Sequence, residues 1–175
     1  VFGKVKKWLA EVLPNFPVYA HMLGNFSVRL AGAAAIVGAP VTALIYGDIT
    51  RQGLPFYTGN VTYVHSFAAD RDADWQLEVP YYDAPVLDVS LDGKPAGMIA
   101  FAPHRLDLGH VSEGGHTISV TAYGNRYNCF APLHNSDRGY KWYGPVSFRT
   151  SGYQWTDEYR IKPFGISDHP YLKQI

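Results

Sequence analysis

Residues 87–101, LDVSLDGKPAGMIAF, decide the fold class. From Leu87 to Leu91 hydrophobic and polar residues alternate, as they do in a strand that buries one face. Asp92-Gly93 follows at once and predicts a tight two-residue hairpin, because both central residues of that turn need positive φ. The return strand is expected over residues 94–101. This stretch therefore predicts a pair of antiparallel strands.

The rest of the chain contains further short runs of the same kind, separated by turn residues. Alternation is clearest in residues 61–67 and 75–79. About ten closely spaced strands with turn signals between them indicate a β-sandwich or barrel. We predict an all-β fold, an antiparallel β-sandwich. Its strands are expected at residues 26–30, 33–37, 41–46, 61–67, 75–79, 87–91, 94–101, 105–108, 117–122, 146–148 and 153–161.

The composition is that of a globular protein. The chain has 175 residues, of which 47% are hydrophobic and 17% charged. A chain of this length can bury a core without disulfides or metal ions to stabilise it. Lys and Arg together number 15, as do Asp and Glu, so no basic face for nucleic acid is indicated. No run reaches the roughly 18 apolar residues of a membrane span, and no signal peptide is recognisable. We expect neither nucleic acid nor membrane as a partner.

The N-terminus carries hydrophobic residues at helical spacing, which predict a short amphipathic helix that ends at Pro14. We expect residues 1–24 to form this helix and a linker, and residues 25–175 to form the β-sandwich domain. So short a helix needs packing, so it is expected to dock on this domain or a neighbour, with membrane-surface binding the less favoured alternative. Because the chain begins with Val1, we expect it to be part of a longer protein. The apolar face is Phe2, Val5, Leu9, Val12 and Leu13.

Candidate metal ligands are few. Asp70, Asp72 and Asp74 alternate in a turn and could bring several oxygens to one Ca²⁺. Arg71 lies among them, however, and a solvated turn is the better interpretation. The histidines show no zinc-ligand spacing, and His65 on an apolar strand face is interpreted as a hydrogen-bonded core residue. No metal and no other cofactor is expected.

The single cysteine excludes an intrachain disulfide. We interpret Cys129 as a small buried hydrophobe, with a loop thiol as the alternative. Catalytic motifs are missing as well: the sequence has no Gly-x-Ser-x-Gly elbow and no phosphate-binding glycine loop. Asp157 and Glu158 would point to opposite faces of a strand and could not flank one glycosidic bond. We expect the chain not to be catalytic by itself.

Residues 124–144 are the most informative segment for function, because ordered loops of this length are uncommon and usually functional. The loop combines flat rings with Asn, Asp, Arg and His side chains, which is what a sugar site needs. Trp142 is the expected stacking platform. The alternative is that the rings fold inward or face a neighbouring domain; we weigh the two evenly. Trp155 and Tyr159, on the next predicted strand, are assigned to the core. The expected ligand-binding residues are Trp142, Tyr143, Arg126, His134 and Asn135.

Several segments resemble a known family. They are GDITRQGLPFYTG at 47–59 with VTY at 61–63, LDGKPAG at 91–97, RLDL at 105–108 and EGGHTISV at 113–120. Together they are similar to the galactose-binding-like jelly rolls appended to large bacterial glycoside hydrolases, such as the sugar-binding domain of β-galactosidase-like enzymes. The chain departs from that pattern at Asp92 and at His116, where asparagine is usual.

The resemblance implies a jelly-roll form of the β-sandwich and an accessory role. The leading hypothesis is a non-catalytic, carbohydrate-associated module of a glycoside hydrolase, which binds a glycan or supports the catalytic domain. Its partners would be a carbohydrate and the catalytic domain of the same polypeptide. A purely structural interdomain module without ligand is the alternative, and a free-standing glycoside hydrolase is a less favoured third hypothesis.

Overall fold

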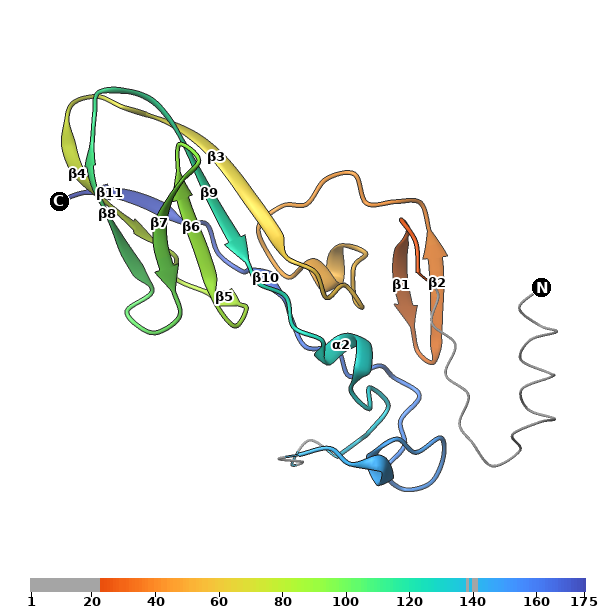
Figure 1. Cartoon of the computed structure of the whole chain (residues 1–175). Coiled ribbons are helices and arrows are strands. Elements are labelled where there is room, and N and C mark those ends of the chain that lie inside the picture. The colour runs from red at the N-terminus through yellow and green to blue at the C-terminus, as the bar shows by residue number, and fades with distance from the viewer. Residues whose placement is uncertain (1–22, 138, 140–141) are drawn as a thin grey trace.

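The computed structural model of the chain describes residues 23–137, 139 and 142–175 (Figure 1). The predicted N-terminal helix lies outside the described residues, and the division at residues 24 and 25 stays a prediction. None of the helices in the described part of the chain is both long and apolar enough to cross a membrane.

The predicted fold class is confirmed: the chain is all-β, and its sheets are antiparallel. Short helical turns interrupt the strands at η1 (Ile49–Gln52), α2 (Tyr127–Phe130) and η2 (Pro145–Ser147). The strands are β1 (Ser27–Ala31), β2 (Ala34–Gly38), β3 (Val61–Ala69), β4 (Ala73–Glu78), β5 (Tyr82–Asp83), β6 (Leu87–Leu91), β7 (Lys94–Ile99), β8 (Arg105–Val111), β9 (Gly114–Ala122), β10 (Gly165–Ile166) and β11 (Tyr171–Gln174).

Two sheets form the sandwich. One has the strand order β3-β9-β6-β7 and the other the order β11-β4-β8, while β10 pairs with β5 and the hairpin β1-β2 stands apart (Figure 1). Along each strand, every second residue points its hydrophobic side chain inward. Burying each such side chain contributes about 1.5–3 kcal/mol to the stability of the fold. The buried core consists of Ile49, Val61, Leu77, Val79, Leu87, Val89, Ile99, Ile118, Val120, Ala122, Phe164 and Ile166.

The predicted hairpin at Asp92-Gly93 is confirmed. Asp92 has a φ of 49° and Gly93 a φ of 74°, so both central residues of the turn adopt the left-handed conformation. The two strands pair antiparallel from Leu87 with Ile99 to Leu91 with Lys94. The two residues at the turn thus set the register of the adjacent pairs, and a bulge between Val89 and Ser90 shifts the register further along the hairpin.

A seam joins the start of the sandwich to its end. The N–H of Ile49 donates to the carbonyl of Phe164 at 2.9 Å, and the N–H of Gly47 donates to the carbonyl of Ile166 at 2.7 Å. The Asp48 carboxylate caps η1 through the N–H of Thr50 at 2.9 Å and also accepts from the N–H of Phe164 at 3.2 Å. The chain therefore returns to the core after a long detour.

Three strand predictions are wrong. Residues 41–46 form no strand, because no other strand pairs with them. The Gln52 side chain bonds the backbone of Ile45 instead: its Oε1 accepts from Ile45 N–H at 3.0 Å, and its Nε2 donates to Ile45 O at 3.1 Å. Residues 146–148 lie mostly in η2, which Pro145 begins. Residues 153–161 are irregular and contribute one isolated bridge. The sequence prediction also missed β5, β10 and β11, which are short.

Candidate functional site

We call residues 124–163 the excursion. This segment leaves the sandwich after β9 and returns before β10 (Figure 1). Its two ends are tied by one buried side chain. Asn128 donates through Nδ2 to the carbonyl of Lys162 at 2.8 Å, and its Oδ1 accepts from the N–H of Lys162 at 2.9 Å. This reciprocal pair holds α2 beside the returning chain, so the excursion is anchored at its base.

The excursion begins at Gly124, whose N–H donates to Oδ1 of Asn60 at 3.1 Å. A Cβ at Gly124 would collide with the carbonyl oxygens of Thr58 and Gly59. Only glycine lets the backbones approach this closely. The second residue after β9 is thereby fixed against the loop that precedes β3.

Further in, His134 lies between two aromatic rings. The His134 ring stacks on Trp155 with centroids 4.4 Å apart and planes inclined by 25°, and its centroid is 4.3 Å from that of Tyr159. Its Nδ1 donates to the carbonyl of Thr156 at 2.9 Å, because a carbonyl oxygen can only accept. Phe56, from the loop after η1, packs edge-on against Tyr159.

A cavity of about 220 Å³ adjoins this stack. Asn135 forms part of its wall and is only 7% exposed. Oδ1 of Asn135 accepts from the N–H of Asp137 at 2.9 Å, whereas Nδ2 is shielded from solvent and has no hydrogen-bond partner among the described residues. An unsatisfied buried donor costs about 1–3 kcal/mol, so a hydroxyl group that reached it, after a small shift of the side chain, would offset that cost.

A second group of side chains lies around Tyr127. The hydroxyl groups of Tyr127 and Tyr143 share a hydrogen bond of 3.0 Å, and Nζ of Lys162 lies 4.0 Å from the centre of the Tyr127 ring. Burial, and then the neighbouring Tyr143 hydroxyl, raise the pKa of Tyr127 to about 12. The phenol is therefore neutral at physiological pH and can donate a hydrogen bond.

The predicted site residues fall in separate places. His134 and Asn135 share the wall of the cavity, and Tyr143 belongs to the Tyr127 group. Trp142 is 72% exposed and packs against Gly144, and Arg126 is exposed at the start of α2. The structure thus brings two of the five predicted residues together at one cavity and puts a freely accessible indole on the same excursion.

Two aromatic residues of this site were assigned elsewhere by sequence reasoning. Trp155 and Tyr159 were assigned to the sandwich core on a predicted strand, but they lie on the irregular part of the excursion and contact His134. No local sequence signal links them to His134, which lies 21 residues before Trp155 in the chain.

Two other interpretations need correction. His65 is exposed on β3 and is not a core histidine. Cys129 is only partly buried, within α2.

The acidic residues do not assemble. The Asp70 carboxylate accepts a hydrogen bond from Nε2 of Gln174 at 2.7 Å, and the Asp72 carboxylate accepts one from the N–H of Glu113 at 2.6 Å. Oδ1 of Asp74 lies 3.7 Å from Nδ1 of His110. Among the described residues no three His, Cys, Asp or Glu side chains gather as a metal site would require. The residues that line the excursion cavity include no carboxylate.

Comparison with known proteins gives the fold and little more. No protein-family profile matches the chain. A 34-residue segment is 68% identical to uncharacterized proteins of Mycobacterium bovis and Mycobacterium tuberculosis; it covers 19% of this chain and 23% of each relative. The chain therefore spans less than a quarter of the length of these relatives.

Among solved structures, a rhamnosidase from Novosphingobium sp. PP1Y shares the fold, with a TM-score of 0.51 and 18% identity. The similarity covers 84% of this chain and 14% of the rhamnosidase. A GH2 beta-galacturonidase from Eisenbergiella tayi gives a TM-score of 0.47 at 22% identity, over 86% of this chain and 22% of that one. The β-sandwich described here thus occurs as a small part of the much longer rhamnosidase chain.

Proposed function

We propose that this chain is a non-catalytic β-sandwich module of a glycoside hydrolase and that it binds a glycan through the excursion. The association with a glycoside hydrolase is supported by the fold, which forms 14% of the rhamnosidase chain, and by the resemblance to galactose-binding-like jelly rolls. The non-catalytic role is supported by the cavity wall. Glycosidases use a pair of carboxyl groups, and the cavity has none.

One observation carries the glycan proposal: a His134 ring held between Trp155 and Tyr159, next to a cavity whose wall contains Asn135, with an amide nitrogen that has no hydrogen-bond partner among the described residues. Sugars present C–H groups to flat rings and hydroxyl groups to polar side chains. The cavity is smaller than the roughly 300–1,000 Å³ of drug-sized sites, so it suits one sugar ring. Trp142, Tyr143 and Arg126 would extend the contact along the exposed surface of the excursion.

The alternative is a structural module without ligand. It is favoured by the internal pairing of the excursion: Thr156 N–H donates to His134 O at 2.9 Å, and Arg160 N–H donates to Leu133 O at 2.7 Å. In that case the aromatic rings only pack the excursion together, and the support of the catalytic domain is the whole function.

A binding screen with indole NMR separates the two. The chain is screened on a glycan array, and the best hit is titrated into ¹⁵N-labelled protein. The indole signals of Trp142 and Trp155 should shift, while that of Trp75 in the sandwich stays unchanged. The proposal fails if no glycan binds, or if the hit shifts Trp75 and leaves the excursion unchanged. Turnover of the hit by the isolated chain would contradict the non-catalytic role.

A further inference from the structure

Strand β3 forms an edge of the four-stranded sheet and is unlike the other edges of the two sandwich sheets. Its sequence VTYVHSFAA contains no charged residue and no proline, and its pairing with β9 runs through all nine residues without a bulge. Exposed sheet edges pair readily with other chains, and natural proteins usually protect them with charges, proline or bulges. None of these three devices is present on β3.

The other edges of the two sandwich sheets carry such devices. β7, on the opposite side of the same sheet, has Lys94, Pro95 and a bulge in its pairing with β6. β8 carries Arg105 and pairs with β4 through another bulge. β11 is only four residues long and contains Lys173. Among the edges of the two sandwich sheets, the lack of protection is thus specific to β3, which indicates that this edge is covered in the working protein.

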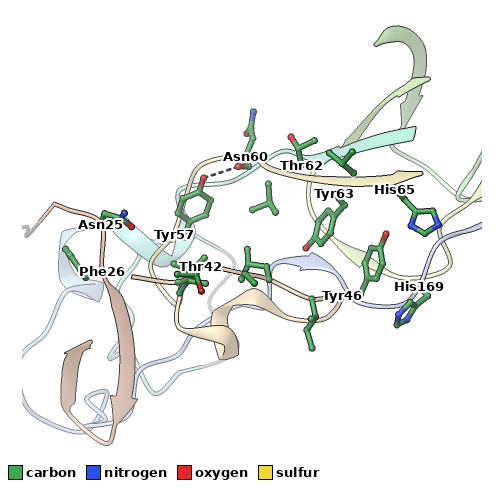
Figure 2. A pocket seen from close by; sticks show the side chains of 17 residues that line it. Asn25, Phe26, Thr42, Tyr46, Tyr57, Asn60, Thr62, Tyr63, His65 and His169 are labelled. Atoms are coloured by element: carbon green, nitrogen blue, oxygen red, sulfur yellow. Dashed lines mark hydrogen bonds between the residues drawn. The ribbon is translucent and has the colours of Figure 1, made fainter. Parts of the chain in front are cut away.

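A cleft of about 910 Å³ runs along the edge of β3 (Figure 2). Five consecutive residues of β3, 61–65, line it. Successive side chains of a strand point to opposite faces, as Thr62 and Tyr63 do in Figure 2. A cleft that touches all five therefore faces the backbone edge of the strand rather than one face of the sheet.

The opposite wall is a second extended stretch, residues 41–46, which also line the cleft consecutively. No backbone hydrogen bond between described residues joins this wall to β3. This stretch has a strand-like sequence, VTALIY, yet it forms no strand because it lacks a strand partner. A strand placed between the two walls would give hydrogen-bond partners to β3 and to the backbone groups of this stretch other than those of Ile45, which bond the Gln52 side chain.

The lining also limits the chemistry of the occupant. None of the described residues that line the cleft is Asp, Glu, Lys or Arg, although 17% of the chain is charged. Stacked rings of Tyr46 and Tyr63, with centroids 5.2 Å apart, and the adjacent ring of His169 close one end. An uncharged segment whose apolar side chains face these rings fits such a wall.

We infer that β3 accepts a single extended, uncharged polypeptide strand, donated by the larger enzyme of which the chain is a module; this rests on the function proposed above. Main-chain hydrogen bonds to residues 61–65 supply the attachment, as in other cases of strand addition. A second copy of the chain fits less well, because the wall at 41–46 stands where the rest of a second sheet would have to lie. One strand needs only about 4.7–4.9 Å on either side.

Hydrogen exchange tests the inference with two matched variants. Val64 on β3 and Met98 on β7 are 65% and 67% exposed and lie on opposite edges of the same sheet. In the complete enzyme the amides of residues 61–65 should exchange more slowly than in the isolated 175-residue chain. Val64→Lys should abolish that protection, because a lysine blocks an edge, and Met98→Lys should leave it unchanged.

A synthetic peptide, VTYVHSFAA, serves as the probe for the isolated chain. It should protect residues 61–65, and its analogue with proline at the fourth position should not. Equal exchange of these amides with and without the probe and in the complete enzyme, or equal effects of the two lysine variants, would overturn the inference. A dimer of the isolated chain that Val64→Lys dissolves would overturn the choice of occupant. None of these measurements involves a sugar, so they stand apart from the glycan-binding test.

Discussion

The imidazole of His116 lies between two acceptors: its Nδ1 is 2.7 Å from Oδ2 of Asp92, and its Nε2 is 2.8 Å from the carbonyl oxygen of Ser112. An ionised carboxylate and a carbonyl can only accept, so both ring nitrogens donate and the ring is an imidazolium. Asp92 also accepts from the N–H of Thr117 at 2.8 Å. The two positions at which the sequence departs from the jelly-roll motif are therefore bonded to each other, and they tie the β6–β7 turn to β9.

This pair predicts a specific dependence of stability on pH. The hydrogen bond to Asp92 raises the pKa of His116 above 6.5, and the bond to His116 lowers the pKa of Asp92 below 3.8. The histidine's contribution is complete below its ordinary pKa and is lost as pH rises through the raised value. The aspartate's contribution is complete above its ordinary pKa and is lost as pH falls through the lowered value. The pair should stabilise the fold most between those two ordinary values.

The measurement compares melting temperatures of the wild type and Asp92→Asn. The difference should be largest at about pH 5.5 and should shrink toward about pH 9, where the imidazole is neutral. Asp88→Asn, on the neighbouring strand, is the control and should show no such trend. A difference that stays constant over this range would mean that the imidazolium does not stabilise the turn.

A second prediction concerns Asp48, which holds the seam between the two ends of the sandwich. Asp48→Ala removes the cap of η1 and leaves the N–H of Phe164, a buried residue, without its acceptor. Together these losses should lower the free energy of unfolding by about 2–4 kcal/mol. Arg51 makes an exposed ion pair with Asp48 at 3.5 Å, and Arg51→Ala should cost less than about 1 kcal/mol. Urea unfolding of both variants checks this; similar losses would mean that the ion pair matters more than the cap.

A third prediction concerns the entrance of the excursion. Gly124→Ala should destabilise the protein by about 1–3 kcal/mol, because its methyl group meets the carbonyl oxygens of Thr58 and Gly59. Gly115→Ala is the matched control, since a Cβ there has no atom within 4 Å. Chemical unfolding should separate the two variants. If both are as stable as the wild type, the entrance is less tightly fixed than its geometry indicates.

Sequence reasoning predicted correctly a structural feature that adjacent residues specify by themselves. The Asp92-Gly93 turn is specified by two adjacent residues, and its hairpin was predicted with nearly correct ends. Strands depend on a partner as well as on their own sequence. Residues 41–46 have a strand-like composition but no strand beside them, and two-residue elements such as β10 carry too little pattern to be recognised.

The candidate site shows the same limit. Sequence reasoning selected His134 and Asn135 because polar and aromatic residues are concentrated in one long loop. It could not find the stack, because Trp155 is brought to His134 by backbone pairing over a distance of 21 residues in the chain, through the bridge between Asn135 and Trp155. The pairing of His116 with Asp92 was equally hidden, since only the folded hairpins bring their side chains together.

The last prediction tests Trp142 as a stacking platform for sugar. Its indole is 72% exposed, so a sugar can reach it without any rearrangement of the core. Trp142→Ala should weaken binding of the best glycan by roughly 1–3 kcal/mol, the scale for loss of an interfacial aromatic, and should leave the melting temperature unchanged. Tyr153, 83% exposed on the same excursion, provides the matched control, because it lies outside the predicted set.

Calorimetric titration of the two alanine variants and the wild type decides between the two functions. A loss confined to Trp142→Ala supports a glycan-binding module. Equal affinity in all three proteins would remove Trp142 from the site, and binding would then depend on the His134 cavity alone. If Tyr153→Ala weakens binding as much as Trp142→Ala, the sugar contacts exposed rings without selecting among them, and the excursion serves as an adhesive surface rather than as a defined site.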